Sequence, residues 1–321
     1  MLKTGIIGGA GYTAGELIRL LIYHPEAEIA FVQSKSQAGK PVSSVHTDLE
    51  GEFFQTFTGE VPEEPDVLFL CSGHGASEAF LKKNSFSNNL KIIDLSTDFR
   101  MKRPGNDFVY GLPELNRPAI CEAKKIANPG CFATAIQLGL LPLADAGLLK
   151  DEIHVHAITG STGAGQQPTE TSHFSWRNNN VSVYKAFDHQ HLGEIGQSIR
   201  QLQPGFGEKI NFLPVRGNFS RGIFASLYTR TDESEQQLKK LYRDFYQNAP
   251  FTKVVDKNPS LKQVVGTNNC IIFLEKHEDK ILIISIIDNL LKGASGQALQ
   301  NMNLVCGLEE TAGLKLKSTA F

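Results

Sequence analysis

Short apolar runs of strand length alternate with amphipathic segments of helix length in the first part of the chain. We expect strands at residues 2–7, 28–33, 67–71, 91–95 and 125–127. Helical spacing of apolar residues predicts helices at residues 13–23 and 77–83, whereas residues 101–123 carry prolines and are expected to be irregular. Strands that alternate with helices form parallel sheets with crossover helices, so this half predicts an α/β domain.

The second half is richer in predicted strands. They fall at residues 153–159, 211–215, 222–229, 271–274 and 280–287. With helices near 192–203 and 233–246 they indicate an α+β domain on a larger sheet. Residues 295–307 predict a helix that returns to the first domain. We therefore expect a first domain of residues 1–130 and 295–321, and a second of residues 131–294.

Composition and charge exclude several classes of protein. The 321 residues suggest about two domains, and 41% hydrophobic with 21% charged residues is ordinary for a soluble globular protein. A net charge of −2 offers no basic surface for nucleic acid. The apolar run at 281–287 is too short to span a bilayer, and the chain starts without a charged leader, so we expect neither a membrane span nor a secretory signal.

The cysteines indicate a compartment. There are five, and no two form a CxxC pair, which argues against a disulfide framework or a zinc knuckle. This usage fits a reducing, cytoplasmic setting.

A glycine-rich loop follows the first predicted strand and opens the first helix. Its sequence is GGAGYTAG, and the residues expected to face a ligand are Gly8, Gly11, Tyr12 and Thr13. Glycines let the backbone approach a pyrophosphate, and the amides at the start of a helix hold the anion. This context predicts a dinucleotide site rather than a turn without a ligand.

The end of the second predicted strand indicates which dinucleotide binds. NAD sites usually place an acid there, whereas this chain has Ser34, Lys35 and Ser36. Two hydroxyls and a cation suit a 2′-phosphate, so we expect NADP; the alternative is that Lys35 is an ordinary solvated lysine.

Cys131 follows Asn128-Pro129-Gly130 and precedes a helical pattern over residues 132–149, in which Pro142 is expected to kink or split the helix. A cysteine at a helix N-terminus is favoured as the thiolate, which is a nucleophile, and nearby amides can bind an oxyanion. The alternative is a buried apolar cysteine, which is the default interpretation for Cys71, Cys270 and Cys306.

The chain as a whole resembles the N-acetyl-γ-glutamyl-phosphate reductases, relatives of aspartate-semialdehyde dehydrogenase. The resemblance runs nearly end to end and rests on the order and spacing of six segments. These are GGAGYTAGEL from Gly8, DLSTDFR from Asp94, YGLPE from Tyr110, NPGCFATA from Asn128, GSTGAG from Gly160 and DNLLKGASGQALQNMN from Asp288. It implies a Rossmann-type NADP domain and an α+β catalytic and oligomerisation domain of the glyceraldehyde-3-phosphate dehydrogenase C-terminal type.

The resemblance also implies a reaction of arginine biosynthesis. Cys131 attacks the γ-carbonyl of the acyl phosphate and expels inorganic phosphate, NADPH reduces the thioester, and the thiohemiacetal collapses to the semialdehyde. It further implies a homodimer or homotetramer.

An acid or base is needed at the thiohemiacetal oxygen, and histidine suits neutral pH. His189 and His191 lie in a segment similar to the family's His-x-His-x-Pro-Glu-Ile, with Gly193 in place of the proline. If the segment is extended, the two rings point to opposite sides, and we favour His189 as the one that faces Cys131. A zinc site lacks a third obvious ligand, so no metal is expected.

The family position of Arg100 implies that it binds the substrate phosphate or carboxylate, which a planar guanidinium suits. The alternative is a surface salt bridge with Asp98.

Further residues are expected near the cofactor. The resemblance places Ser161 and Gly163 beside the nicotinamide and its phosphates and assigns Asn289 to the nicotinamide amide. Ser72 and His74 follow a predicted strand and are expected at the cofactor edge.

Other functions remain open from the sequence. The same chemistry applies to N-succinyl-γ-glutamyl phosphate or to carrier-bound aminoadipyl phosphate, although a carrier protein should need a basic docking surface. A non-catalytic NADP sensor is the alternative of another class, and it has no use for a nucleophilic cysteine.

Overall fold

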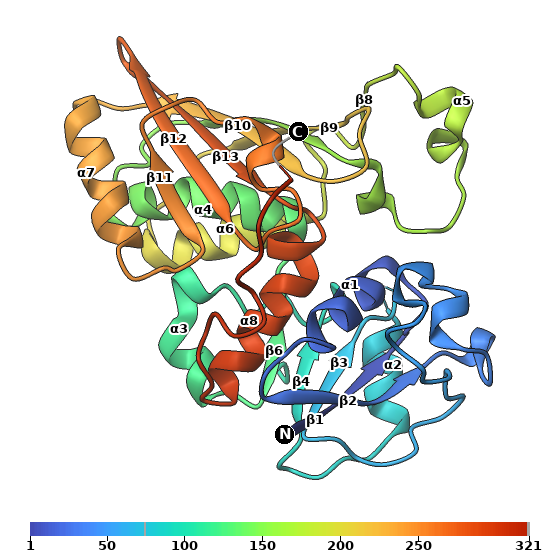
Figure 1. Cartoon of the computed structure of the whole chain (residues 1–321). Coiled ribbons are helices and arrows are strands. Elements are labelled where there is room, and N and C mark those ends of the chain that lie inside the picture. Colours follow the sequence, from blue (N-terminus) through green and yellow to red (C-terminus); the bar gives the residue numbers. More distant parts are fainter. Residues whose placement is uncertain (74, 320–321) are drawn as a thin grey trace. The chain divides into compact units, whose positions relative to one another are not determined.

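The computed structural model describes residues 1–73 and 75–319, which divide into two compact units. The first unit contains Met1–Pro129 and Ala294–Lys315, and the second contains Gly130–Gly293 and the segment that begins at Leu316. Of the segment 295–321 that the sequence assigns to the first domain, the residues from Leu316 group with the second unit instead. Figure 1 shows the elements of each unit along the chain.

The first unit is built on a parallel six-stranded sheet in the order β2-β1-β3-β4-β6-β5. Its strands are β1 (Leu2–Ile7), β2 (Ala27–Gln33), β3 (Val67–Leu70), β4 (Lys91–Asp94), β5 (Val109–Tyr110) and β6 (Lys125–Ala127). The chain moves from β1 to β2 on one side and from β3 to β4 on the other. The carboxyl ends of β1 and β3 therefore form the switch point at which such sheets bind ligands.

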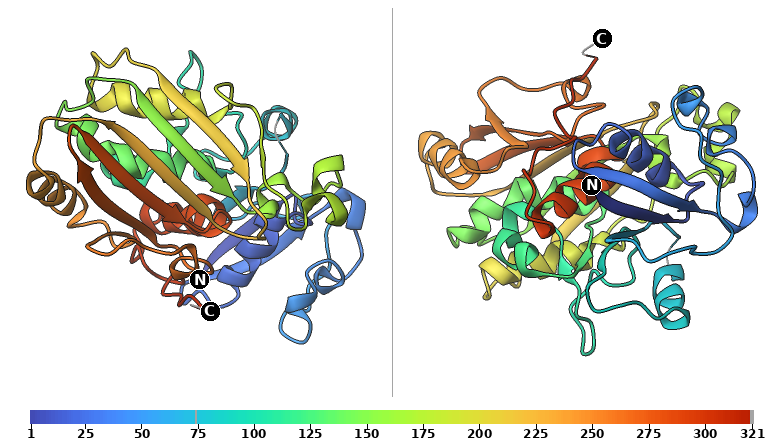
Figure 2. Two further views of the ribbon diagram at one scale, coloured as in Figure 1. Left: turned by 90° about the horizontal axis from the view of Figure 1, so that it is seen from above. Right: turned by 60° about the horizontal axis from the view of Figure 1, so that its bottom comes forward.

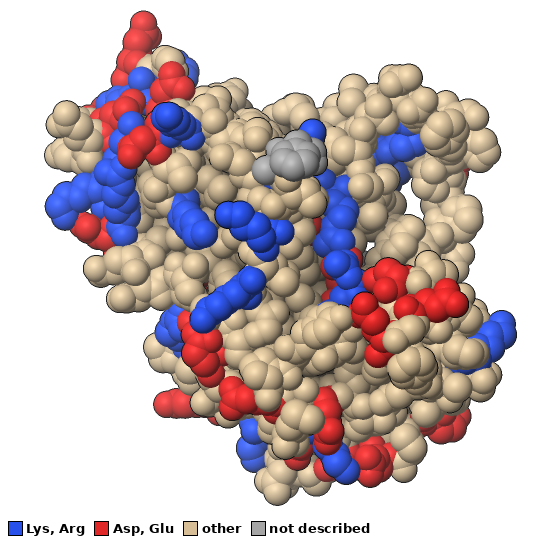
Figure 3. All heavy atoms as spheres, in the orientation of Figure 1, with Lys and Arg blue, Asp and Glu red and all other residues tan. Residues whose placement is uncertain are grey.

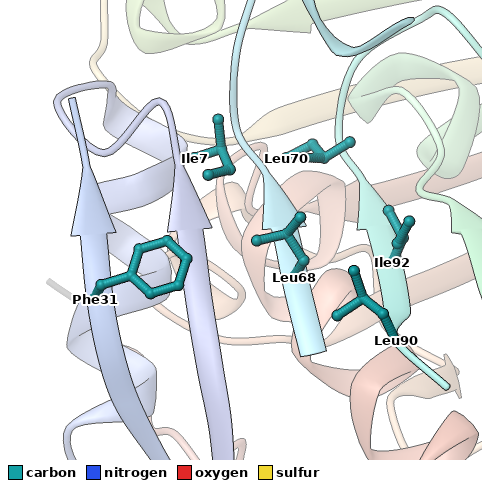
Figure 4. Packing of buried hydrophobic residues seen from close by; sticks show 6 residues of the cluster. All are labelled: Ile7, Phe31, Leu68, Leu70, Leu90 and Ile92. Atoms are coloured by element: carbon teal, nitrogen blue, oxygen red, sulfur yellow. The ribbon is translucent and has the colours of Figure 1, made fainter. Parts of the chain in front are cut away.

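Helices cover both faces of this sheet. They are α1 (Tyr12–Leu21), α2 (Ala76–Lys83), α3 (Pro113–Glu122) and α8 (Gly296–Val305). Figure 4 shows apolar side chains of β1 to β4 on the face that α2 covers with Phe80 and Leu81. Since right-handed crossovers in opposite directions put their helices on opposite faces, α1 lies on the other face, where it contacts α8. The predicted α/β class is confirmed.

The expectation of irregular structure at 101–123 is wrong. This stretch contains β5 and α3, because Pro113 occupies the first turn of α3, where no amide donor is needed. Pro118 lies inside the helix, and Asn116 leaves helical geometry at φ −125° and ψ 20°. The helix is therefore broken near its middle, which obscures its pattern in the sequence.

The second unit is built on a mixed seven-stranded sheet in the order β11-β12-β13-β10-β7-β9-β8. Its strands are β7 (Ile153–Thr159), β8 (Ser182–Val183), β9 (Ile210–Arg216), β10 (Ile223–Arg230), β11 (Thr252–Val255), β12 (Cys270–His277) and β13 (Lys280–Ile287). Figure 2 shows helices gathered on one face. The helices of this unit are α4 (Cys131–Asp145), α5 (Phe174–Arg177), α6 (His191–Leu202) and α7 (Glu235–Tyr246). The edge strands β8 and β11 were not expected.

Short helical turns connect these elements. They are η1 (Lys35–Gln37), η2 (Val42–Ser44), η3 (Thr47–Leu49), η4 (Ser161–Ala164), η5 (Glu170–Ser172), η6 (Leu261–Gln263) and the π-helical turn η7 (Leu291–Ser295). None of the helices in the described ranges has the length and apolarity needed to cross a bilayer.

Charged residues on α7 are paired rather than gathered by sign. Lys239 and Glu235 lie 2.6 Å apart, and Arg243 reaches Asp256 at 2.6 Å. Figure 3 shows acidic and basic side chains intermingled over this helix. The polar face of α7 is thus an ordinary solvated surface.

Helix α4 continues through Pro142, so the expected split of this helix is wrong. Proline has no amide hydrogen, and the carbonyl of Leu138 one turn earlier therefore loses its helical donor. The Tyr246 hydroxyl, at the end of α7, donates to that carbonyl, and the Tyr242 hydroxyl donates to the Gly139 carbonyl at 2.6 Å. Helix α7 thus supplies the hydrogen bond that Pro142 removes.

Replacing Tyr246 by Phe removes this donor, and we expect the free energy of unfolding to fall by about 1–2 kcal/mol. Pro142→Ala restores an amide donor, so the double variant should lose less than the sum of the two single variants. Denaturant unfolding of the four proteins measures the difference. Tyr242→Phe is the control, with a smaller loss because the Gly139 carbonyl can still accept from the helix. Additive effects in the cycle would contradict this role of Tyr246.

Candidate active site

Cys131 is the first residue of α4 and is partly exposed. Gly130 caps the helix in an extended conformation, and its carbonyl accepts from the Thr134 amide at 2.8 Å and the Thr134 hydroxyl at 3.1 Å. No acidic residue occupies the first turn. The positive end of the helix therefore favours a thiolate at Cys131.

Cys71, Cys306 and Cys270 are less suited than Cys131 to act as nucleophiles. Burial raises the pKa of Cys71 to about 12 and that of Cys306 to about 11, so both remain thiols at neutral pH. Cys270 is fully buried in β12, and its sulfur lies 3.5 Å from the Ser285 hydroxyl.

Two glycines let other groups come close to Cys131. A Cβ added to Gly293 would lie 2.8 Å from the Cβ of Cys131, closer than real side chains approach. A Cβ added to Gly130 would lie 2.3 Å from Nε2 of His191. The imidazole of His191 is thus packed directly on the backbone that leads into the nucleophile.

Asp288 holds the turn that presents Gly293. Its carbonyl accepts from the Gly293 amide at 2.9 Å, and its carboxylate accepts from the amides of Leu290 and Leu291 at 2.8 and 3.1 Å. Arg221 pairs with both carboxylate oxygens, at 3.0 and 3.1 Å. Asp288 is fully buried, so this charge is compensated by a bidentate partner and by amides.

The two histidines lie together. His191 is the first residue of α6, so the segment is not extended and the expectation of opposite-facing rings is wrong. The ring centroids are 4.6 Å apart, and both rings pack against buried Phe132. Glu194, one helical turn after His191, accepts from the Gly130 amide at 2.9 Å, and its other oxygen lies 3.9 Å from Nε2 of His191. A carboxylate, an imidazole and the cap of the cysteine helix are therefore linked.

His189 is held as a neutral ring. Its Nδ1 accepts from the His191 amide at 3.2 Å, so the proton of the neutral ring is on Nε2. Burial, and secondarily the charge of Lys185, lower the pKa of His189 from 6.5 to about 4, against an opposing effect of Glu194. A neutral imidazole at physiological pH donates a hydrogen bond but is a poor source of protons.

Close packing in the first unit explains the glycines of the nucleotide loop. Gly8 adopts φ +79°, and a Cβ there would lie 2.9 Å from the backbone of Cys71 and Ser72 at the end of β3. Gly11 caps α1, and Tyr12 begins it. The Thr13 hydroxyl bonds the Cys71 thiol. The loop therefore lies at the switch point of the sheet, as dinucleotide binding requires.

The residues expected at the 2′-phosphate follow β2. Ser34 is buried, with its hydroxyl 3.5 Å from that of Ser36, and Lys35 begins η1 with an exposed side chain. No acid occupies these positions, and their role in cofactor choice stays a prediction.

Asn289 braces the turn η4, which contains Ser161 and Gly163. Its amide donates to the Thr162 hydroxyl at 3.0 Å, and its carbonyl accepts from the Gly222 amide at 2.7 Å. The side chain therefore shapes this turn, and its expected contact with nicotinamide stays a prediction. Ser72 is half-buried after β3, and His74 lies outside the described residues.

Arg100 is buried in the first unit. Nε donates to the Asn128 carbonyl at 2.9 Å, and Nη2 donates to another main-chain carbonyl. Asp98, its alternative partner, accepts from the amides of Gly75 and Glu78 and so caps α2. Since Asn128 precedes Cys131 by three residues, Arg100 restrains the entry to the cysteine loop; substrate binding by Arg100 stays a prediction.

Glu194, Gly293 and Tyr184, whose ring centroid lies 5.9 Å from that of His189, were missed as site residues. The sequence did contain a signal for Glu194, which lies three residues after His191 on one helical face. Gly293 and Tyr184 are far from the cysteine in sequence and have no local signal. No group of three His, Cys, Asp or Glu residues able to hold a metal occurs in the described part of the chain.

The lowered pKa of His189 predicts a dependence of stability on pH. Between pH 6.5 and about 4 the unfolded chain binds a proton at this site that the folded chain does not, so the free energy of unfolding should fall as the pH drops through this range. The loss should be on the order of 2 kcal/mol. His189→Gln should flatten the profile measured by urea unfolding, whereas a change at exposed His173 should not. Equal slopes for wild type and His189→Gln would contradict the shift.

Comparisons with known proteins show the family and the fold of this chain. Residues 3–123 match the family described as semialdehyde dehydrogenase, NAD binding domain, and residues 131–289 match semialdehyde dehydrogenase, dimerisation domain. The structure is similar to aspartate semialdehyde dehydrogenase II of Vibrio cholerae, with a TM-score of 0.74 and 18% identity over 96% of this chain and 98% of that one. The likeness to the Candida albicans enzyme with NADP has a TM-score of 0.73 and 16% identity, over 95% and 98%. At these identities the likeness shows the fold alone.

Sequence relatives are much closer. The N-acetyl-gamma-glutamyl-phosphate reductase of Parabacteroides distasonis is 59% identical over 100% of both chains, and that of Bacteroides fragilis is 60% identical over 100% of both. The Flavobacterium johnsoniae protein of the same name is 59% identical over the same shares. This chain therefore belongs to the N-acetyl-gamma-glutamyl-phosphate reductase family of semialdehyde dehydrogenases.

Proposed function

We propose that this protein is an enzyme that reduces N-acetyl-γ-glutamyl phosphate to N-acetylglutamate 5-semialdehyde with NADPH, through a thioester on Cys131, in arginine biosynthesis. The observation that supports it most is Cys131 at the start of α4, with the His191–Glu194 pair packed on the helix cap. The names of the full-length relatives support the same substrate.

Cys131 makes and breaks the covalent bond. Its thiolate attacks the γ-carbonyl carbon, the bond to the phosphate oxygen breaks, and inorganic phosphate leaves with the electron pair. The amides at the start of α4 are suited to the oxyanion that forms at the carbonyl oxygen. The nicotinamide cofactor, when bound, supplies the hydride that reduces the acyl group.

His191 acts as the general acid and base at the substrate oxygen. It protonates the oxygen of the reduced adduct and takes that proton back when the aldehyde forms and the Cys131 thiolate leaves. Glu194 supports the charged imidazole, whereas the lowered pKa of His189 keeps that ring neutral and unsuited to supply the proton. These contacts favour His191 as the acid and base, although the sequence had favoured His189.

The first unit fits a dinucleotide, and we propose NADP. Gly8 lets the loop lie against the end of β3, and Gly11 caps α1, whose first backbone amides suit a pyrophosphate. Ser34, Lys35 and Ser36 offer hydroxyls and a cation where an NAD site has an acid.

We also propose a cytoplasmic homo-oligomer, either dimer or tetramer. The match to a dimerisation domain supports association of subunits. On β10, Tyr228 is 44% exposed, and its ring stacks on that of His154 with the two ring centroids 4.6 Å apart. None of the five cysteines forms a disulfide in the described part of the chain, which fits a reducing compartment.

The proposed activity is tested in the reverse direction. We expect the protein to reduce NADP with N-acetylglutamate 5-semialdehyde and phosphate, and Cys131→Ser to lose at least about a thousandfold in kcat. Cys306→Ser is the matched control and should keep full activity. Activity retained in Cys131→Ser would overturn the thioester mechanism.

Outcomes with an inactive wild type identify the alternatives. Turnover of the N-succinyl or carrier-bound semialdehyde would transfer the same chemistry to that substrate. NADP binding without turnover of any of these would indicate the non-catalytic sensor.

Lys35→Ala tests the cofactor. Losing a cation that pairs with the 2′-phosphate should raise the KM for NADPH about tenfold and leave the KM for NADH unchanged. Lys83→Ala, which removes a solvated lysine at the end of α2, is the control. Steady-state kinetics with both cofactors measure the change, and an equal effect on the two would contradict a phosphate contact.

A further inference from the structure

Arg177, the last residue of α5, is a buried cation without a partner. Its side chain is 8% exposed, and Nε, Nη1 and Nη2 have no hydrogen-bond partner among the described residues. Burying a charge without compensation is strongly unfavourable, so such a group normally has a bound partner or a functional reason.

A second arginine lies beside it. Arg216 ends β9, stacks over the ring of Tyr184 at 4.6 Å and donates to the Thr171 hydroxyl. Burial, and secondarily the like charge of Arg216, lower the pKa of Arg177. Neither arginine has a carboxylate within ion-pair distance in the part of the chain that the structure describes.

Tyr184 connects this pair to the active site of the same unit. Its ring lies 5.9 Å from that of His189 at an angle of 71°, and burial, with a smaller contribution from the charge of Cys131, raises the pKa of its hydroxyl. The backbone amide of Tyr184 donates a hydrogen bond to the Pro214 carbonyl at 3.1 Å, next to the antiparallel pairing of β8 with β9. This hydrogen bond fixes the position of Tyr184. Tyr184 therefore contacts Arg216 on one hand and His189 on the other within the same unit.

The segment between α5 and α6 is held in an unfavourable backbone conformation. Asn179, Lys185 and Phe187 have φ values of 55°, 44° and 60°, in the left-handed region. Figure 1 shows β8 in this segment, which follows α5. Such strain persists where the surrounding structure imposes it, and it is common at ligand sites.

We propose that Arg177 and Arg216 bind a carboxylate of the acyl substrate and so hold its acyl chain beside Cys131. A carboxylate supplies the missing negative charge, and a planar guanidinium accepts it in a bidentate geometry. The assignment rests on the proposed function for the identity of the acyl chain, and it places substrate recognition on residues other than Arg100.

The first test measures binding without turnover. Cys131 is alkylated with iodoacetamide, and the rate is measured with N-acetyl-L-glutamate as the protecting probe. We expect wild type to be protected and Arg177→Met to need at least about thirtyfold more probe. Arg230→Met, which changes an exposed arginine of the same sheet, should behave as wild type. Equal protection of Arg177→Met and wild type would overturn the proposal.

Matched probes identify the bound group. 4-Acetamidobutanoate lacks the α-carboxylate and should protect weakly if Arg177 binds that group. N-succinyl-L-glutamate carries an additional carboxylate, and much stronger protection by it, lost in Arg177→Met, would assign the pair to the acyl substituent. Protection by inorganic phosphate that depends on Arg177, with none by either glutamate derivative, would overturn the choice of a carboxylate.

Kinetics and stability provide independent tests. Arg177→Met and Arg216→Met should raise the KM for the semialdehyde at least about thirtyfold and leave the KM for phosphate within about threefold. Arg177→Met should not lower the thermal midpoint, because it removes an uncompensated buried charge. A lower midpoint with unchanged KM would show a structural arginine and overturn the proposal. If wild type does not turn over but Arg177-dependent protection persists, the proposed function fails while the carboxylate site stands.

Discussion

The close approach of Cys131 and the His191 ring to two glycines is the constraint on which this site depends. Gly293 has no room for a side chain beside the cysteine, and Gly130 has none beside the ring of His191. The helix terminus, the thiol and the imidazole can meet only because both positions lack a Cβ. The buried Asp288 then fixes the turn before Gly293, and the Glu194 carboxylate fixes the amide of Gly130.

Compensated and uncompensated charges separate the scaffold from the ligand site. Asp288 is fully buried, but Arg221 and three backbone amides (those of Gly266, Leu290 and Leu291) satisfy its oxygens, as a structural ion needs. Arg177 is nearly as buried and has none of these partners. The same energetic rule thus gives opposite interpretations: the ion of Asp288 is structural, whereas the missing partners of Arg177 are the basis for assigning it an incoming carboxylate.

Patterns that repeat locally could be predicted from the sequence, whereas contacts between distant segments could not. The alternation of apolar runs predicted β1 to β4 and the parallel sheet, and the NPGC segment predicted the helix that starts at Cys131. Pro142 misled the prediction for α4 because the compensating hydroxyl of Tyr246 is 104 residues away from it along the chain and leaves no local signal. Gly293, Arg177 and Arg216 could not be predicted for the same reason, since they lie far from Cys131 in the sequence and only folding brings them to the site.

The histidine pair shows why residue type alone could not assign roles. An extended segment would have separated the two rings, but α6 begins at His191 and turns both toward Phe132. The amide of His191 then fixes the tautomer of His189, and burial keeps that ring neutral. His191 is left beside a carboxylate, where a charged imidazole is stabilised. Two identical side chains two residues apart therefore acquire different chemistry from one helix boundary, which the spacing of the sequence does not determine.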